Sequence, residues 1–187
     1  ALGQAGASQV EFTSASLALR EVPGVSIARA QSMRPAAQAG WPQQTGRVTG
    51  GDPAMLCVRP GDWLLISEAG DAGQLLDRAS EQADPARTAV HDHSDGLALF
   101  RLSGAGAPWL LNKLSGLDFQ SGVNSGPHCA RTRLGHVAAV VHYHQPEPGS
   151  FVFDLVFDRS VAKYLWELLT ASVAHADELA AGFGAAS

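Results

Sequence analysis

Apolar and polar positions along this chain follow one pattern that occurs three times. In each copy, two short apolar runs are joined by a turn and followed by an amphipathic helix. The first copy consists of Ala54–Val58, Asp62–Ser67 and a helix over residues 71–83. The second consists of Thr88–His93, Leu97–Leu102 and a helix that begins near Ala107. The third consists of Val137–His144, Phe151–Phe157 and a helix over residues 158–173. A hairpin has one apolar face that needs a cover, and a helix that follows directly can supply it. The pattern therefore predicts a single α+β domain built from β-β-α units, with an antiparallel sheet covered by helices.

The third unit indicates how the core is packed. Aromatic and leucine positions between Phe151 and Phe157 alternate with a second set that includes Asp154, which is the period of a half-buried strand. Asp158 is placed to cap the first free amides of the helix that follows. The apolar stripe of that helix consists of Val161, Leu165, Leu168 and Leu169. We expect this stripe and the aromatic face of the strand to form the centre of the core.

The first 51 residues differ in composition from the remainder. Residues 1–16 are small and polar, and residues 33–52 are rich in glycine and proline with little periodicity. The one large aromatic side chain of this second stretch is Trp41. We therefore predict an N-terminal extension and partner-contacting arm over residues 1–51, and a compact α+β domain over residues 52–187.

One turn signal lies inside the predicted extension. Pro23 and Gly24 separate the apolar runs Leu17–Val22 and Val25–Ala30. Proline followed by glycine is a strong turn signal. The two runs therefore predict either one more short hairpin or an edge strand.

Charge and cysteine content narrow the class of protein. The formal net charge is −5 and no basic cluster interrupts the sequence, which argues against a nucleic-acid or anionic-membrane surface as the main role. No apolar run approaches the ~20 residues that span a bilayer, and no Lys/Arg-led signal segment is recognisable. The two cysteines, Cys57 and Cys129, lie outside any CxxC motif. They predict buried, reduced thiols in a cytoplasmic protein.

Five stretches, taken in order, carry a resemblance to a known family. They are Arg59–Ile66, His91–Gly96, Leu102–Gly104, Cys129–Val137, and Phe153–Leu155 leading into Arg159–Leu169. Together they resemble the gamma subunit of bacterial heterotetrameric sarcosine oxidase, over residues 54–173. The resemblance implies a non-catalytic structural subunit of a complex that oxidatively demethylates sarcosine to glycine with O2 and tetrahydrofolate. It also implies alpha, beta and delta subunits as partners, which carry FAD, FMN, NAD, tetrahydrofolate and zinc, and no cofactor on this chain.

That family is in turn similar to the folate-binding domain of the glycine-cleavage T-protein. Asp92 matches an aspartate that helps to position tetrahydrofolate in the T-protein, but Asp95 stands where the T-protein has a histidine. The T-protein stretch Gly-Tyr-Thr-Gly-Glu, whose glutamate holds the pterin, is replaced here by His142–Gly149. The fold is therefore expected to be kept and the folate site to be lost. The alternatives are a stand-alone folate-binding one-carbon protein related to aminomethyltransferase and a free-standing small-molecule-binding module.

Two histidine pairs are candidate metal ligands. His91 with His93, and His142 with His144, each place two imidazoles on one face of a strand. If the two strands were neighbours, four nitrogens would meet at a metal. No cysteine or closely spaced carboxylate in the sequence completes a known ligand pattern. Surface histidines near hairpin turns are therefore favoured, and no metal-binding residue is assigned.

Three further constellations have a structural interpretation that is preferred over a chemical one. The turn Ser103–Ala107 could hold a phosphate at a helix N-terminus, but it lacks the dinucleotide-binding pattern and suits a tight turn. Cys129 lies near Arg131, but no base is identifiable, which favours a structural thiol. Glu147 lies in a proline-rich turn and is expected to be solvated. No catalytic or cofactor-binding residue is assigned to this chain.

Three tryptophans are the candidate partner contacts. Trp109 lies nearly opposite the inward stripe of the second helix, Trp166 lies on the flank of the third, and Trp41 lies in the predicted arm. Large aromatics on outward faces are enriched where proteins meet. The alternative is an intrachain contact in which Trp109 lies under the arm, against Trp41.

Overall fold

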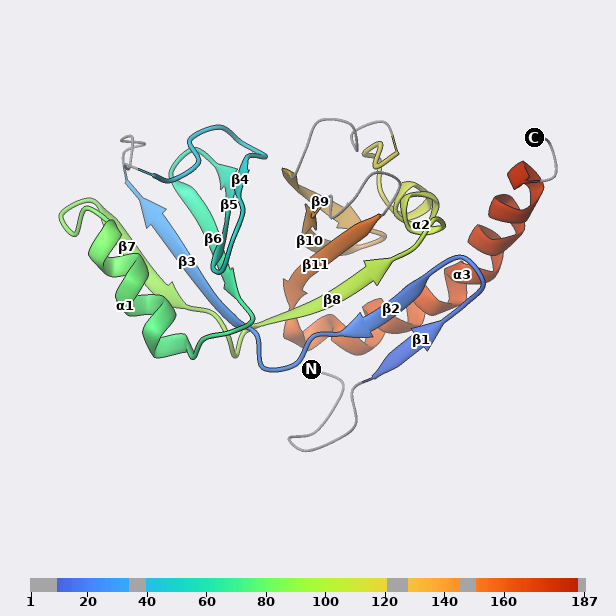
Figure 1. Ribbon diagram of the computed structural model, residues 1–187, viewed down its shortest axis with the longest axis horizontal. Helices are drawn as coiled ribbons and strands as arrows, with labels where there is room; N and C mark the ends of the chain where they lie inside the picture. The colour runs from blue at the N-terminus through green and yellow to red at the C-terminus, as the bar shows by residue number, and fades with distance from the viewer. Residues whose placement is uncertain (1–9, 34–39, 121–127, 145–150, 185–187) are drawn as a thin grey trace. The chain divides into compact units, whose positions relative to one another are not determined.

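The protein folds into two compact units, each built around one sheet (Figure 1). The computed structural model describes residues 10–33, 40–120, 128–144 and 151–184, and within these ranges it describes side chains up to residue 173. The first unit comprises Ala1–Pro23, Ala98–Gly126 and Arg131–Ser187, and the second comprises Gly24–Leu97 and Pro127–Ala130. The predicted α+β class is confirmed, but the predicted single domain is replaced by two units. In the described part of the chain, no helix is long and apolar enough to cross a membrane.

The second unit holds a five-stranded antiparallel sheet covered by one helix. Its strands, in spatial order, are β4 (Val48–Thr49), β5 (Ala54–Arg59), β6 (Asp62–Ser67), β3 (Ser26–Ser32) and β7 (Thr88–Asp92). The helix is α1 (Ala72–Gln82), and the Asp71 carboxylate caps it by accepting a hydrogen bond from the Gln74 amide at 2.8 Å. Leu75 and Ala79 of this helix pack with Trp63 in the core of the unit.

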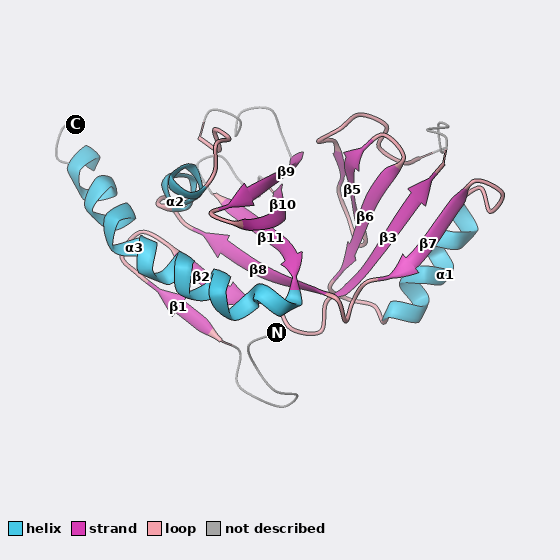
Figure 2. Cartoon of the chain, turned by 180° about the vertical axis from the view of Figure 1, so that it is seen from behind, coloured by secondary structure: helices cyan, strands magenta, loops and turns pink. Residues whose placement is uncertain are grey.

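The first unit holds a six-stranded sheet with helices on one face. Its strands, in spatial order, are β1 (Glu11–Thr13), β2 (Ala18–Glu21), β8 (Leu97–Ser103), β11 (Val152–Asp158), β10 (Val137–Tyr143) and β9 (His128–Leu134). The helices are α2 (Ala107–Leu114), a 3-10 turn η2 (Arg159–Val161) and α3 (Ala162–Gly184), which runs along the sheet in Figure 2. Phe100, Phe153 and Phe157 of the sheet pack with Leu165 and Leu169 of α3, as the apolar stripe predicted.

The first and third β-β-α units form as predicted. β5 pairs with β6, and β10 pairs with β11, in both cases as antiparallel neighbours. The cap of the third helix also forms, because the Asp158 carboxylate accepts a hydrogen bond from the Ser160 amide at 2.9 Å. Helix α3 continues past the predicted end at residue 173.

The second predicted hairpin does not form, and neither does the hairpin around Pro23-Gly24. β7 and β8 are consecutive in sequence but belong to different sheets. The same is true of β2 and β3. β3 lies between β6 and β7, so it is an interior strand and not an edge strand. The predicted boundary between residues 51 and 52 therefore falls inside the second unit. Residues 11–32 supply strands to both sheets, which the prediction of a simple N-terminal extension missed.

Candidate functional site

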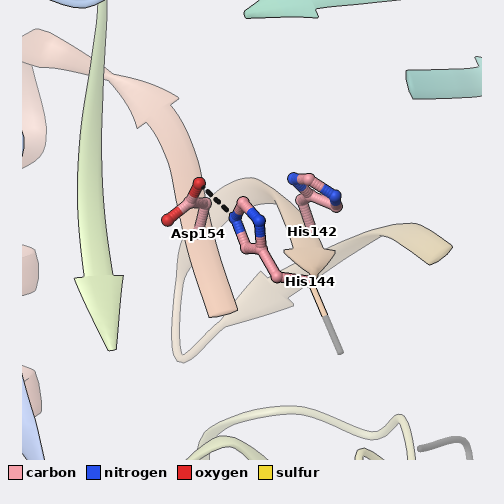
Figure 3. Close-up of side chains that lie close together, drawn as sticks. All are labelled: His142, His144 and Asp154. Atoms are coloured by element: carbon pink, nitrogen blue, oxygen red, sulfur yellow. Dashed lines mark hydrogen bonds and ion pairs between the residues drawn. The ribbon is translucent and has the colours of Figure 1, made fainter. Parts of the chain in front are cut away.

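A buried group of charged and histidine side chains lies on the sheet of the first unit, on the face opposite the helices. Arg101 comes from β8, Asp154 from β11 and His142 from β10, and His144 directly follows β10. Figure 3 shows His142, His144 and Asp154 close together. Because side chains alternate along a strand, Phe153 and Leu155 point toward the helices and Asp154 points to the other face. His142 is the direct cross-strand partner of Asp154.

Asp154 is held by two neighbours at short distances. The Arg101 guanidinium donates from Nε to Oδ1 at 2.7 Å and from Nη2 to Oδ2 at 2.8 Å, which is the bidentate geometry that suits a carboxylate. Nε2 of His144 lies 2.6 Å from Oδ2. The Asp154 side chain is 2% exposed, against 16% for Arg101 and 29% for His144. The carboxylate is thus buried, but it is paired on both oxygens.

The environment keeps Asp154 ionised. Burial alone would raise the pKa of this carboxyl, because a charged group loses solvation. The hydrogen bonds and charges of Arg101 and His144 outweigh burial and hold the pKa below its ordinary value. Removal of Arg101, which binds both oxygens, would leave the buried charge without its main compensation.

The two histidines of this group lie next to each other. The ring centroids of His142 and His144 are 4.0 Å apart with planes tilted by 39°, and His142 is buried. One ligand atom from each of His142, His144 and Asp154 lies within 4.8 Å of the other two. The sequence interpretation found the histidine pair and missed the carboxylate, because Asp154 lies ten residues from His144. The signal that could have found it is an aspartate in a strand with apolar residues on both faces, Val152 and Val156 included.

The other histidine pair is differently placed. His91 and His93 lie at the end of β7, in the sheet of the second unit, where His91 is exposed and His93 is half-buried. The two pairs therefore belong to strands of different sheets, and the condition for a four-nitrogen site, neighbouring strands, is not met. Among the described residues, only the group of His142, His144 and Asp154 brings three potential ligands together.

Asp92 has a structural role in the turn after β7. Its carboxylate accepts a hydrogen bond from the Ser94 amide at 2.8 Å, and hydrogen bonding to Ser94 lowers the pKa of Asp92. The Ser94 hydroxyl in turn accepts from the Ile27 amide at 3.0 Å, which fixes the turn to β3. Asp92 is exposed, and its carboxylate is engaged in a hydrogen bond within the chain.

The turn between β8 and α2 is a close backbone contact. Gly104 has φ +110°, and a Cβ at this position would collide with the Ser16 carbonyl and the Leu17 Cα. The Gly106 amide donates to the Ser16 carbonyl at 3.0 Å, and the Gly104 amide donates to Phe151 at 3.0 Å. These amides are bonded to the backbone just before β2 and β11, which agrees with the tight-turn interpretation over phosphate binding.

The cysteines are structural. Both are free and buried, and burial raises the pKa of Cys129 to about 12. A thiol with that pKa is protonated at neutral pH and is a poor nucleophile. Glu147 lies outside the described residues.

The tryptophans differ from the prediction in two of three cases. Trp41 is 4% exposed and packs edge-on against Trp63 at 5.1 Å, so its assignment as a partner contact is wrong. Trp166 is half-buried and packs edge-on against Phe100 at 5.4 Å, so its ring belongs in large part to the core of the first unit. Trp109 is half-buried on α2, and its role in partner contacts stays a prediction.

The fold has solved relatives. A chain of the heterotetrameric sarcosine oxidase from Corynebacterium sp. U-96, in complex with pyrrole 2-carboxylate, matches with a TM-score of 0.73 and 19% identity over 85% of this chain and 84% of its own. The glycine cleavage system aminomethyltransferase T from Bartonella henselae matches with a TM-score of 0.58 and 14% identity over 83% of this chain. This chain covers 45% of that enzyme, less than half of its length. The fold is thus of the class shared by sarcosine oxidase and the T-protein.

The sequence itself identifies the family. The model of the sarcosine oxidase gamma subunit family matches residues 25–175. The chain belongs to the sarcosine oxidase gamma subunit family. No curated protein matches it.

Proposed function

We propose that this chain is a non-catalytic structural subunit of a heterotetrameric sarcosine oxidase. The observation that carries the proposal is the family match over residues 25–175. It is supported by the shared fold, which extends over more than four-fifths of this chain and of the matched chain of the Corynebacterium enzyme. In the proposed complex, alpha, beta and delta subunits are the partners and the complex oxidatively demethylates sarcosine to glycine with O2 and tetrahydrofolate.

The proposal places the redox chemistry on the other subunits. FAD, FMN, NAD, tetrahydrofolate and zinc are assigned to them and no redox cofactor to this chain. The candidate reactive groups of this chain support that division, because the Cys129 thiol has a pKa of about 12 and the Asp154 carboxylate is paired with Arg101. A cytoplasmic location is part of the proposal and agrees with the two free, buried thiols.

A stand-alone folate-binding protein is the alternative, since the T-protein shares the fold. The position of Asp92 argues against it. Its carboxylate already accepts the Ser94 amide in a turn on the surface, whereas a pterin needs a carboxylate held opposite its donor edge. The proposed partner contact on this chain is the outward face of α2, where Trp109 lies.

Native co-purification tests the proposal. The chain is tagged at its genomic locus and purified at low salt, and the eluate is analysed for bound flavin and for sarcosine-dependent hydrogen peroxide production. We expect larger, flavin-containing subunits to co-elute and both signals to be present. A free chain that carries no flavoprotein, and that binds tetrahydrofolate with a micromolar Kd in calorimetry, would support the alternative.

The role of Trp109 is tested in the same assay. Trp109→Gln should keep the thermal midpoint of the chain and weaken its recovery with the larger subunits. Tyr164→Gln, an exposed aromatic on the neighbouring helix α3, serves as the matched control. Equal recovery of the larger subunits with both variants would remove Trp109 from the contact.

A further inference from the structure

The group formed by His142, His144 and Asp154 has the composition of a metal site. Two imidazoles and one carboxylate are a ligand set that proteins use for zinc and for iron(II). The ligand atoms of the three residues lie within 4.8 Å of one another. Around a tetrahedral zinc the ligand atoms would be about 3.3–3.6 Å apart, given bond lengths of ~2.0–2.2 Å. His144 Nε2 and Asp154 Oδ2, which are 2.6 Å apart, would separate slightly while the more distant ligand atoms move closer. Small side-chain rotations achieve this, and His144, which is 29% exposed, has room to make them.

The backbone favours this convergence. His142 lies on β10 and His144 directly follows the strand, and because the two are separated by one residue they project to the same side. Asp154 lies directly opposite His142 on β11, so the carboxylate projects to that face as well. In Figure 3 the His144 ring lies between the other two side chains. Two paired strands, together with the residue that directly follows β10, therefore supply all three ligands.

Arg101 is the competing group. It binds both oxygens of Asp154, and a divalent cation beside it is opposed by its positive charge. The two hydrogen bonds from Arg101 also orient the Asp154 carboxylate, and a carboxylate that is held in this way is better placed to bind a metal. Each carboxylate oxygen has more than one lone pair, so Oδ2 can accept from Arg101 and still face a metal. The cation must be one that imidazole binds well, which favours zinc over calcium or magnesium.

We propose that His142, His144 and Asp154 form a binding site for one zinc-class divalent ion, with Arg101 positioning the carboxylate. On binding, the metal takes the place of the hydrogen between His144 and Asp154. A neutral His144 moves its single ring proton from Nε2 to Nδ1 by exchange with solvent, and a protonated His144 releases its Nε2 proton to solvent and keeps the one on Nδ1. Three protein ligands leave a fourth position for water or for a group from another chain. The site is separate from the proposed subunit role and does not depend on it.

Metal content, compared between variants, tests the proposal. The full chain is prepared with whatever partners remain bound, dialysed against buffer with micromolar Zn2+, and analysed by elemental mass spectrometry. The double variant His142→Gln and His144→Gln is prepared in parallel, so that metal held by any other chain cancels in the difference. We expect the wild type to hold about one more zinc per chain than this variant.

The second histidine pair provides a matched control. His91→Gln with His93→Gln removes a histidine pair of the same spacing at the end of β7, where the described residues bring no third potential ligand near, and should leave the zinc content unchanged. Co2+ substitution should give visible ligand-field bands in the wild type that are lost in the His142 and His144 variant. Equal zinc content in wild type and that variant, or a loss that follows the His91 and His93 variant, would overturn the proposal. Circular dichroism of each variant confirms that the comparison is between folded chains.

Discussion

Arg101 and Asp154 join β8 to β11 through two hydrogen bonds, of 2.7 and 2.8 Å, on the face of the sheet that the helices leave uncovered. Because the Asp154 side chain is 2% exposed, this pair replaces the solvation that the carboxylate loses on folding. The strands that it joins are far apart in sequence. The pair therefore fixes a long-range strand neighbour that no hairpin turn dictates.

Arg101→Gln should destabilise the protein strongly, because it leaves Asp154 buried without its main partner. Removing one partner of a buried pair typically costs about 3–5 kcal/mol. The free energy of unfolding, measured in urea, checks this. Lys163→Gln is the control: its ion pair with Glu167 on α3 is long, at 3.9 Å, and exposed, so no measurable change is expected.

The contribution of Asp154 should depend on pH in a defined direction. The folded state lowers the pKa of this carboxyl, so ionised Asp154 stabilises the fold above the unfolded pKa of ~3.9. This stabilisation is lost as the pH falls through the lower, folded pKa. The gap in stability between the wild type and Asp154→Asn should be constant from pH 7 to about 5 and shrink in stronger acid. A gap that widens as the pH falls below 4 would contradict this assignment.

Gly104→Ala should be costly because of backbone geometry and close packing at this position. The backbone φ of +110° is strained for alanine, and the added Cβ would collide with the Ser16 carbonyl. We expect a loss of about 1–3 kcal/mol, measured by denaturation. Gly116→Ala is the matched control, because its Cβ would meet nothing within 4 Å.

Trp41→Ala should unfold the second unit more easily, because the indole packs on Trp63 and its Nε1 donates to Gln82 at 3.2 Å. Large-to-small changes of buried aromatics typically cost about 3–5 kcal/mol. Thermal denaturation followed by tryptophan fluorescence measures the effect. If Trp41→Ala kept the wild-type thermal midpoint and lost partner binding instead, the conclusion that Trp41 stabilises the second unit would be wrong.

Neither cysteine should react with thiol reagents in the folded protein. Both are buried, and the pKa of Cys129 is raised to about 12, so its thiolate is scarce at neutral pH. Ellman's reagent should detect no thiol in buffer and two in denaturant. Rapid labelling of Cys129 in the native state would contradict its structural role.

Local signals in the sequence predicted local structure well. Asp71 and Asp158 were both identified as helix starts, and each carboxylate caps the first turn that follows it. The apolar stripe of α3 was also identified, with Leu165 and Leu169 fully buried. Capping and periodicity act over a few residues, so they are visible in a single sequence.

Strand pairing was predicted where it is local and missed where it is not. β5 with β6 and β10 with β11 are sequence neighbours and were predicted as hairpins. β2 pairs with β8, matching Ala18 with Ser103, and no turn signal indicates such a partner. The same limit applies to Asp154, whose partner Arg101 lies on a strand distant in sequence. Periodicity gives the face of a side chain but not the strand that will lie beside it.

The sequence of the second unit is inserted within that of the first, and this nesting has a consequence for synthesis and for shortened versions of the chain. β1 and β2 leave the ribosome early but must wait for β8, and β8 must wait for β11, before their sheet is complete. The second unit has all five strands of its sheet by Asp92 and can gain order sooner. Contacts between such distant segments slow folding, since a large loop must close before they form. A chain that starts at Asp52 would lose β1 and β2 from one sheet and β3 and β4 from the other, so the early residues are integral parts of both units.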